Sequence, residues 1–142
     1  MAILSGECHC GNIIFDLHTD REASELVPRE CSCGLCLKHR ASWISDPQGE
    51  VHVHYKNRDH VSSYRFGHKT ADFIICARCG VLMIAYCEIE GRGRAVLNTR
   101  SMPENLFTAP PVTTNFDGED ISARLARRAK NWTGKVIFDV PL

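Results

Sequence analysis

The chain has 142 residues, the length of one ordinary domain, and 44% of them are hydrophobic, as in soluble globular proteins. Seventeen basic side chains balance 17 acidic ones, so the charge gives no support for binding to nucleic acid or to a membrane surface. The longest apolar stretch, around 81–86, is far too short to span a bilayer, and residues 1–7 lack the features of a signal peptide. We therefore expect a cytoplasmic protein, in which thiols stay reduced.

Strand patterns dominate the first two thirds of the sequence. Apolar and polar residues alternate in some segments, and short apolar runs bounded by turn residues make up the others. The segments predicted to be strands are 13–17, 51–55, 61–66, 73–76, 81–89 and 95–99. Residues 102–106, with Pro103 near their start, predict a single helical turn. The core is therefore predicted to be mainly β.

The C-terminal part of the chain shows a helical pattern instead. An acidic run at 117–120 precedes Ile121, Leu125 and Ala129, which recur at helical spacing. Basic residues cover the rest of this helix, and we interpret them as a solvated face, with a docking surface as the alternative; they are Arg124, Arg127, Arg128 and Lys130. Gly134 is predicted to end the helix, and 136–138 to form a last short strand. We divide the chain into a domain at 1–107 and a C-terminal extension at 108–142 that packs on it.

Seven of the eight cysteines fall in four tight motifs and give the strongest chemical signal in the sequence. Residues two apart in an extended segment face the same side, so a C-x-C pair can present two sulfurs to one ion. A C-x-x-C turn also brings two thiolates together around zinc, and a glycine after it permits a positive φ. The motifs are Cys8-His-Cys10, Cys31-Ser-Cys33, Cys33-Gly-Leu-Cys36 and Cys76-Ala-Arg-Cys79. This spacing predicts zinc ligands rather than disulfide partners.

Seven ligands divide into four and three, and the residues alone leave two divisions open. Four ligands make a closed structural zinc site, whereas three leave an open position for chemistry. In one division the closed, ribbon-like site consists of Cys33, Cys36, Cys76 and Cys79. In the other it consists of Cys8, Cys10, Cys76 and Cys79, and the open site consists of Cys31, Cys33 and Cys36. We prefer the second division because it keeps each local cluster intact.

Other candidate groups are weaker. Cys87 stands alone in the apolar segment 81–89 and is predicted to be an ordinary buried thiol. The basic run 38–40 follows the cysteine triplet, where it can attract substrate carboxylates or simply form a solvated turn. His52 and His54 fall on the polar face of the segment 51–55 and are predicted to be surface imidazoles.

The order of the cysteine motifs resembles that of the glutathione-dependent formaldehyde-activating enzyme family, also called the GFA or centromere-protein-V type. The pattern of that family is G-x-C-x-C-G, then C-x-C-x-x-C, then C-x-x-C-G. The matching segments here are Gly6-Glu-Cys8-His-Cys10-Gly11, Cys31-Ser-Cys33-Gly-Leu-Cys36 and Cys76-Ala-Arg-Cys79-Gly80. The resemblance extends over about residues 3–107.

The resemblance implies a zinc-pinned, tent-like fold of small antiparallel sheets, to which this chain adds a C-terminal helix. It implies two zinc ions: a structural one at Cys8, Cys10, Cys76 and Cys79, and a labile, catalytic one at Cys31, Cys33 and Cys36. The implied activity is that of a carbon–sulfur lyase that forms or cleaves adducts of glutathione, or another small thiol, with an aldehyde such as formaldehyde. The alternative is a non-catalytic, zinc-stabilised protein-binding module of the same fold.

Overall fold

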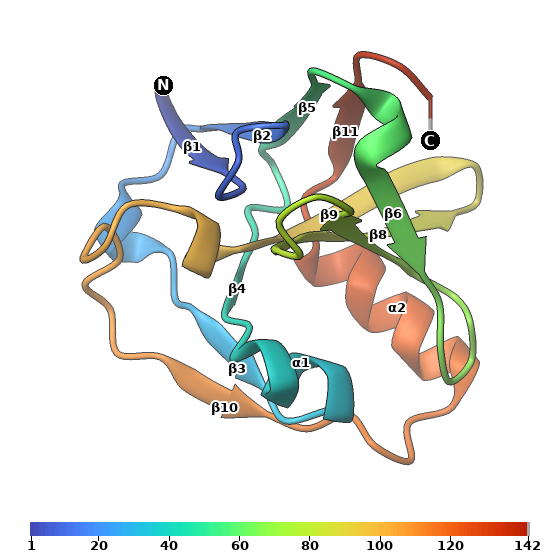
Figure 1. The fold of residues 1–142 in the computed structure, drawn as a ribbon. Coiled ribbons are helices and arrows are strands. Elements are labelled where there is room, and N and C mark those ends of the chain that lie inside the picture. The colour runs from blue at the N-terminus through green and yellow to red at the C-terminus, as the bar shows by residue number, and fades with distance from the viewer. Residues whose placement is uncertain (142) are drawn as a thin grey trace.

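Two β-sheets make up most of the structure, a computed structural model that describes residues 1–141 (Figure 1). The first sheet, in spatial order, contains β1 (Ala2–Glu7), β2 (Ile13–Thr19), β5 (Glu50–Tyr55) and β11 (Lys135–Phe138). The second contains β10 (Val112–Thr114), β3 (Arg29–Cys31), β4 (Trp43–Ile44), β9 (Arg92–Asn98), β8 (Leu82–Ile89), β7 (Asp72–Cys76) and β6 (Val61–Tyr64). The α-helices are α1 (Gly34–His39) and α2 (Ile121–Asn131). The predicted mainly-β class is therefore confirmed.

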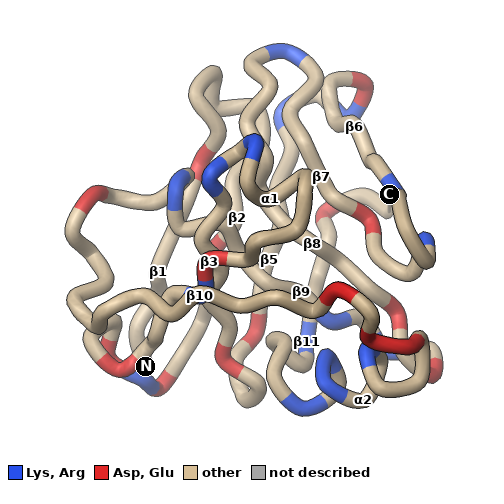
Figure 2. Tube along the Cα trace, turned by 90° about the horizontal axis from the view of Figure 1, so that it is seen from below, with Lys and Arg blue, Asp and Glu red and all other residues tan. Residues whose placement is uncertain are grey.

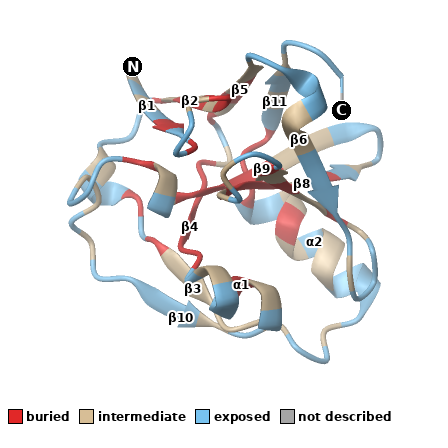
Figure 3. Cartoon of the chain, in the orientation of Figure 1, coloured by how far each residue is buried: buried red, intermediate tan, exposed pale blue. Residues whose placement is uncertain are grey.

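The hydrophobic core draws on both sheets. Ile13, Phe15 and Leu17 alternate along β2 with half-buried residues and are themselves completely buried. In β5, Val51 and Val53 lie opposite Leu17 and Phe15 in antiparallel register. These side chains share one cluster with buried residues of β7, β8 and β9. Strands β8 and β9 lie at the centre of Figure 3. The two-residue alternation of the sequence thus directs one face of β2 and β5 into the core.

The C-terminal segment contributes one strand to each sheet. β10 pairs with β3 and β11 pairs with β5, and both pairings are parallel, whereas the others in the two sheets are antiparallel. A parallel neighbour requires a long connection. The connections here are long because both C-terminal strands return to strands from the first half of the chain.

Two local predictions are wrong. The helical turn expected at 102–106 lies earlier, as the 3₁₀ turn Thr99–Ser101, because the Asn98 side chain caps it by accepting a hydrogen bond from the Arg100 backbone N–H. Gly134 does not end α2, since the helix stops at Asn131. A Cβ on Gly134 would lie 2.7 Å from the Pro47 carbonyl oxygen, so this glycine permits a close backbone approach.

The predicted C-terminal helix is confirmed as α2. It begins after Asp120, whose carboxylate accepts a hydrogen bond of 2.7 Å from the Ala123 backbone N–H and so caps the first turn. No helix within residues 1–141 is long and apolar enough to cross a membrane.

Candidate metal centres and an arginine-lined cavity

Two hairpin turns bring Cys8, Cys10, Cys76 and Cys79 together. The first turn joins β1 to β2, and the second joins β7 to β8. Both close in the same way: the Cys8 N–H donates to the Ile13 carbonyl, and the Cys76 N–H donates to the Val81 carbonyl, each at 3.0 Å. All four sulfurs lie within 4.8 Å of one another. We call this group the four-cysteine cluster.

The four-cysteine cluster fits a tetrahedral metal ion. The Cys10 sulfur lies 3.7 Å from that of Cys8 and 3.5 Å from that of Cys76. Zinc–sulfur bonds of about 2.3 Å in a tetrahedron require sulfurs about 3.8 Å apart. Burial raises the pKa of the Cys8 thiol to about 11, so its thiolate needs a nearby cation. The donor set and its spacing are therefore those of a thiolate metal site.

A second group, the three-cysteine cluster, consists of Cys31, Cys33 and Cys36. Cys31 ends β3, Cys33 is the N-cap residue of α1, and Cys36 lies in the first turns of α1, where it is buried. Their sulfurs also lie within 4.8 Å of one another, and within residues 1–141 no fourth Cys, His, Asp or Glu joins the group. Three thiolates can hold a metal ion and leave one position open.

The electrostatics of the three-cysteine cluster favour a thiolate at Cys33. The neighbouring Cys31 and Cys36 thiols lower the pKa of Cys33, and backbone N–H groups of α1 add to this effect, which outweighs that of burial. The neighbouring Cys31 and Cys33 sulfurs, together with burial, raise the pKa of Cys36. A negative charge is thus concentrated at the N-terminal end of α1, where a cation would bind.

The structure groups the seven cysteines as in the preferred division of the sequence. The other division is not formed, because Cys33 and Cys36 gather with Cys31 and not with Cys76 and Cys79. Cys87 belongs to neither cluster and is buried in β8, as predicted. The residues can hold two metal ions, and zinc remains the predicted metal.

The three-cysteine cluster lines a cavity of about 310 Å³. Aromatic rings form much of its wall; they belong to Trp43, Phe66, Phe73, Phe116 and Trp132. Four arginines also line it: Arg29 from β3, and Arg124, Arg127 and Arg128 from α2. The cavity therefore combines a candidate metal site, an apolar wall and a concentration of positive charge.

The interpretation of the α2 arginines as a solvated face is wrong. Arg124 and Arg127 are only partly exposed and Arg128 is buried, whereas Ile121 at the start of the helix is 45% exposed. Figure 2 shows basic residues along α2 and acidic residues just before it. The arginines face inward because they contact groups there. Arg127 pairs with Glu119, and Arg128 contacts Thr70 and the ring of Trp132. Periodicity alone does not detect such partners.

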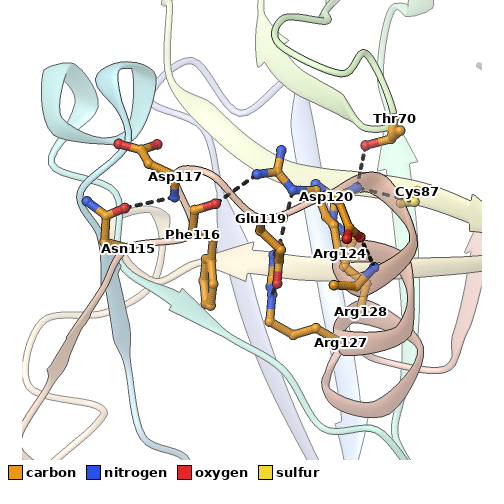
Figure 4. A network of polar contacts seen from close by, with 11 residues as sticks. Thr70, Cys87, Asn115, Phe116, Asp117, Glu119, Asp120, Arg124, Arg127 and Arg128 are labelled. Atoms are coloured by element: carbon orange, nitrogen blue, oxygen red, sulfur yellow. Dashed lines mark hydrogen bonds and ion pairs between the residues drawn. The ribbon is translucent and has the colours of Figure 1, made fainter.

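Ion pairs engage two of the α2 arginines. Glu119 accepts two hydrogen bonds of 3.0 Å from Arg127 and one of 3.2 Å from Arg124, as Figure 4 shows. The Arg127 guanidinium also stacks over the Phe116 ring at 3.5 Å. These pairs lower the pKa of Glu119, chiefly through Arg127, and hold the segment before α2 against the cavity.

The basic run 38–40 forms a solvated turn and does not face the cavity. Lys38 and Arg40 are exposed, and Arg40 ends α1 in the left-handed conformation with φ 51°. The cavity takes its positive charge from Arg29 and α2 instead. Sequence reasoning also missed His68, which lines the cavity from the turn between β6 and β7 and has no distinguishing neighbours in the sequence.

His52 and His54 lie half-buried on the outward side of β5, as their alternation with Val51 and Val53 predicts. His54 contacts Asp139 at 2.8 Å and Asp16 at 3.3 Å. These imidazoles belong to the first sheet and do not line the cavity beside the three-cysteine cluster.

The sequence matches no established family model. The structure is similar to the crystal structure of a Rhodobacter sphaeroides protein, with a TM-score of 0.59 and 21% sequence identity. The match covers 78% of this chain and all of the other. At this identity the likeness shows a shared fold and says nothing about the chemistry of either protein.

Proposed function

We propose that this protein is a zinc-dependent enzyme of the carbon–sulfur lyase type, acting on adducts of a small thiol such as glutathione with an aldehyde such as formaldehyde. The observation that carries the proposal is the three-cysteine cluster in the wall of the cavity, with no fourth Cys, His, Asp or Glu gathered to it within residues 1–141. The resemblance of the cysteine motifs to the glutathione-dependent formaldehyde-activating family supports the same activity.

The two clusters would have different roles. Cys8, Cys10, Cys76 and Cys79 would hold a structural zinc that joins the β1–β2 turn to the β7–β8 turn, and with it the first sheet to the second. Cys31, Cys33 and Cys36 would hold the catalytic zinc at the cavity. When bound there, zinc supplies the positive charge that favours the ionised form of a substrate thiol.

The reaction joins a thiol to a carbonyl compound. The thiol sulfur attacks the carbonyl carbon, a carbon–sulfur bond forms as the carbon–oxygen double bond becomes single, and the thiol proton ends on the oxygen. The reverse reaction returns both compounds, so neither oxidant nor reductant is needed. The chain would orient the reactants against the aromatic wall, and the imidazole of His68 is a cavity group that can accept and return the proton.

The test is exchange between formaldehyde and glutathione, followed by NMR on zinc-loaded protein. We expect Cys33→Ser to lower the enzyme-catalysed exchange by at least about 100-fold, because it removes a ligand of the catalytic ion. Leu37→Ser is the matched control, since Leu37 is 61% exposed on the same helix and does not line the cavity. Unchanged exchange in Cys33→Ser would reject the proposed enzyme activity and favour the alternative, a non-catalytic protein-binding module.

A further inference from the structure

The positive charge in the cavity exceeds the negative charge available to balance it. Arg124 and Arg127 share the single carboxylate of Glu119. Arg29 donates to the Ser45 hydroxyl at 2.7 Å, and within residues 1–141 neither Arg29 nor Arg128 forms an ion pair with a carboxylate. Asp117 is the one acidic side chain among the lining residues. Four guanidinium groups therefore face two carboxylates, which leaves two positive charges before the three-cysteine cluster is counted.

Arg128 is the most unusual of these groups. It is only 6% exposed, yet no carboxylate contacts it: Nη1 donates to the Thr70 hydroxyl at 2.9 Å and to the Cys87 sulfur at 3.6 Å. Its Nε is buried without a hydrogen-bond partner, and the guanidinium lies 4.8 Å from the centre of the Trp132 ring (Figure 4 shows the polar contacts). A buried cation without a carboxylate partner is costly for a fold to keep.

Burial lowers the pKa of Arg128; the Cys87 sulfur opposes this effect, and the neighbouring Arg127 and Arg124 add to it. Guanidinium groups nevertheless stay charged in proteins. Arg128 therefore keeps its positive charge in the cavity wall, and an anion that enters the cavity would neutralise this charge. A thiolate-rich zinc site would neutralise one of the two excess charges, so one positive charge is left for a ligand.

We propose that the cavity binds a small organic monocarboxylate with an aromatic or apolar body, whose carboxylate lies against Arg128. Carboxylate and phosphate both match a guanidinium fork in geometry, but a carboxylate carries the single negative charge that balances the one positive charge left. The five aromatic rings in the wall suit an apolar body, and 310 Å³ is at the lower end of the usual range of ligand pockets, about 300–1,000 Å³. If the proposed function holds, the thiol substrate would be a small thiol with one carboxylate, its sulfur would face the three-cysteine cluster, and glutathione, which has two carboxylates, would be a poorer substrate.

The chain carries its own reporter for such binding. Trp43 and Trp132 are its two tryptophans, and both line the cavity. Phenylacetate serves as the probe, because it has a carboxylate and an aromatic ring but no thiol, and phenylacetamide is its uncharged counterpart. We expect a saturable change in tryptophan fluorescence with phenylacetate, on zinc-loaded and metal-free protein, and at least about tenfold weaker binding of the amide.

Arg128→Met should weaken phenylacetate binding by at least about tenfold, because it removes the charged donor and keeps an apolar side chain of similar reach. Lys130→Met is the matched control, since Lys130 is exposed on the same helix and does not line the cavity. If Arg128→Met does not fold, as judged by circular dichroism, the acid–amide comparison on the wild type still decides the matter.

Equal affinity for phenylacetate and phenylacetamide, unchanged binding in folded Arg128→Met, or tighter binding of inorganic phosphate than of phenylacetate would each overturn the inference. The outcomes also separate it from the proposed function. If the wild type binds phenylacetate but has no carbon–sulfur lyase activity, only the proposed function is rejected. Activity without any preference for the acid over the amide would reject the carboxylate site alone.

Discussion

The two cysteine clusters differ in how the chain builds them. The four-cysteine cluster joins residues far apart, since Cys10 and Cys76 are separated by 66 positions and belong to turns of different sheets. The three-cysteine cluster is local, because its members lie within six consecutive residues at the junction of β3 and α1. Only the second lines the arginine-rich cavity.

This difference assigns fold stability to the four-cysteine cluster and ligand chemistry to the three-cysteine cluster. A metal ion that links distant segments removes much of the freedom of the unfolded chain, so its binding free energy becomes folding free energy. A metal ion held by six adjacent residues restricts the chain far less. It is free to serve a ligand in the cavity, and its loss should leave the rest of the fold in place.

The largest expected effect comes from removing one ligand of each cluster. Cys10→Ser should lower the free energy of unfolding of the zinc-loaded protein by about 3 kcal/mol or more, and the Tm by roughly 10 °C. Cys33→Ser should cost about 1 kcal/mol or less, because serine is a favoured N-cap residue and the lost site is local. Thermal unfolding and zinc content, measured on both variants, check the comparison.

Cys10→Ser and Cys33→Ser can be compared directly, because each replaces one metal ligand by serine at a site that is not fully buried. Cys10 is exposed and Cys33 half-exposed, so serine adds no fully buried polar group in either. Each variant should lose one of two zinc ions. Equal falls in Tm would show that the clusters contribute alike to the fold, and would contradict the assignment of the structural role to the four-cysteine cluster.

Local patterns made the frame of the molecule predictable. The alternation of Ile13, Phe15 and Leu17 identifies β2 because one face of that strand is completely buried. The cysteine motifs identify both clusters because a C-x-C or C-x-x-C spacing brings sulfurs together whatever the rest of the chain does. Strands β4 and β10 escaped prediction, since they have two and three residues and form only by pairing with neighbours.

The cavity was not predictable, because its wall comes from segments that meet only in the folded chain. Arg29, Phe66 and Arg128 belong to distant parts of the sequence. Hydrophobic periodicity assigns arginine to solvent, yet tertiary packing places Arg128 inside, beside Thr70 and Cys87. The basic run 38–40 is adjacent to the triplet in sequence but does not line the cavity.

A smaller effect concerns the ion pairs beside the cavity. The arginines lower the pKa of Glu119, so the pairing stabilises the fold above the ordinary glutamate pKa and is lost as the pH falls through the lowered value. Glu119→Gln removes this contribution. Between pH 7 and about pH 3, the wild type should therefore lose about 0.5–1 kcal/mol more stability than the variant, a modest figure because solvent screens the pair.

Denaturant unfolding of both proteins across this pH range measures the difference. Release of metal from protonated cysteines affects both alike and cancels in the comparison. A wild type that loses no more stability than Glu119→Gln would show that Glu119 does not hold the segment before α2.

The last prediction compares the same substitution beside each cluster. Gly80 follows the C-x-x-C turn of the four-cysteine cluster with φ +78°, whereas Gly34 is the first residue of α1 in the three-cysteine cluster. An added Cβ meets no atom within 4 Å at either glycine, so only backbone preference differs. Gly80→Ala should lower the free energy of unfolding by about 1–2 kcal/mol. Gly34→Ala should raise it by about 0.4–1 kcal/mol. Opposite shifts of the denaturant midpoint would confirm that the two turns differ in strain; shifts of the same sign would mean that metal retention, rather than backbone conformation, governs the response of both clusters.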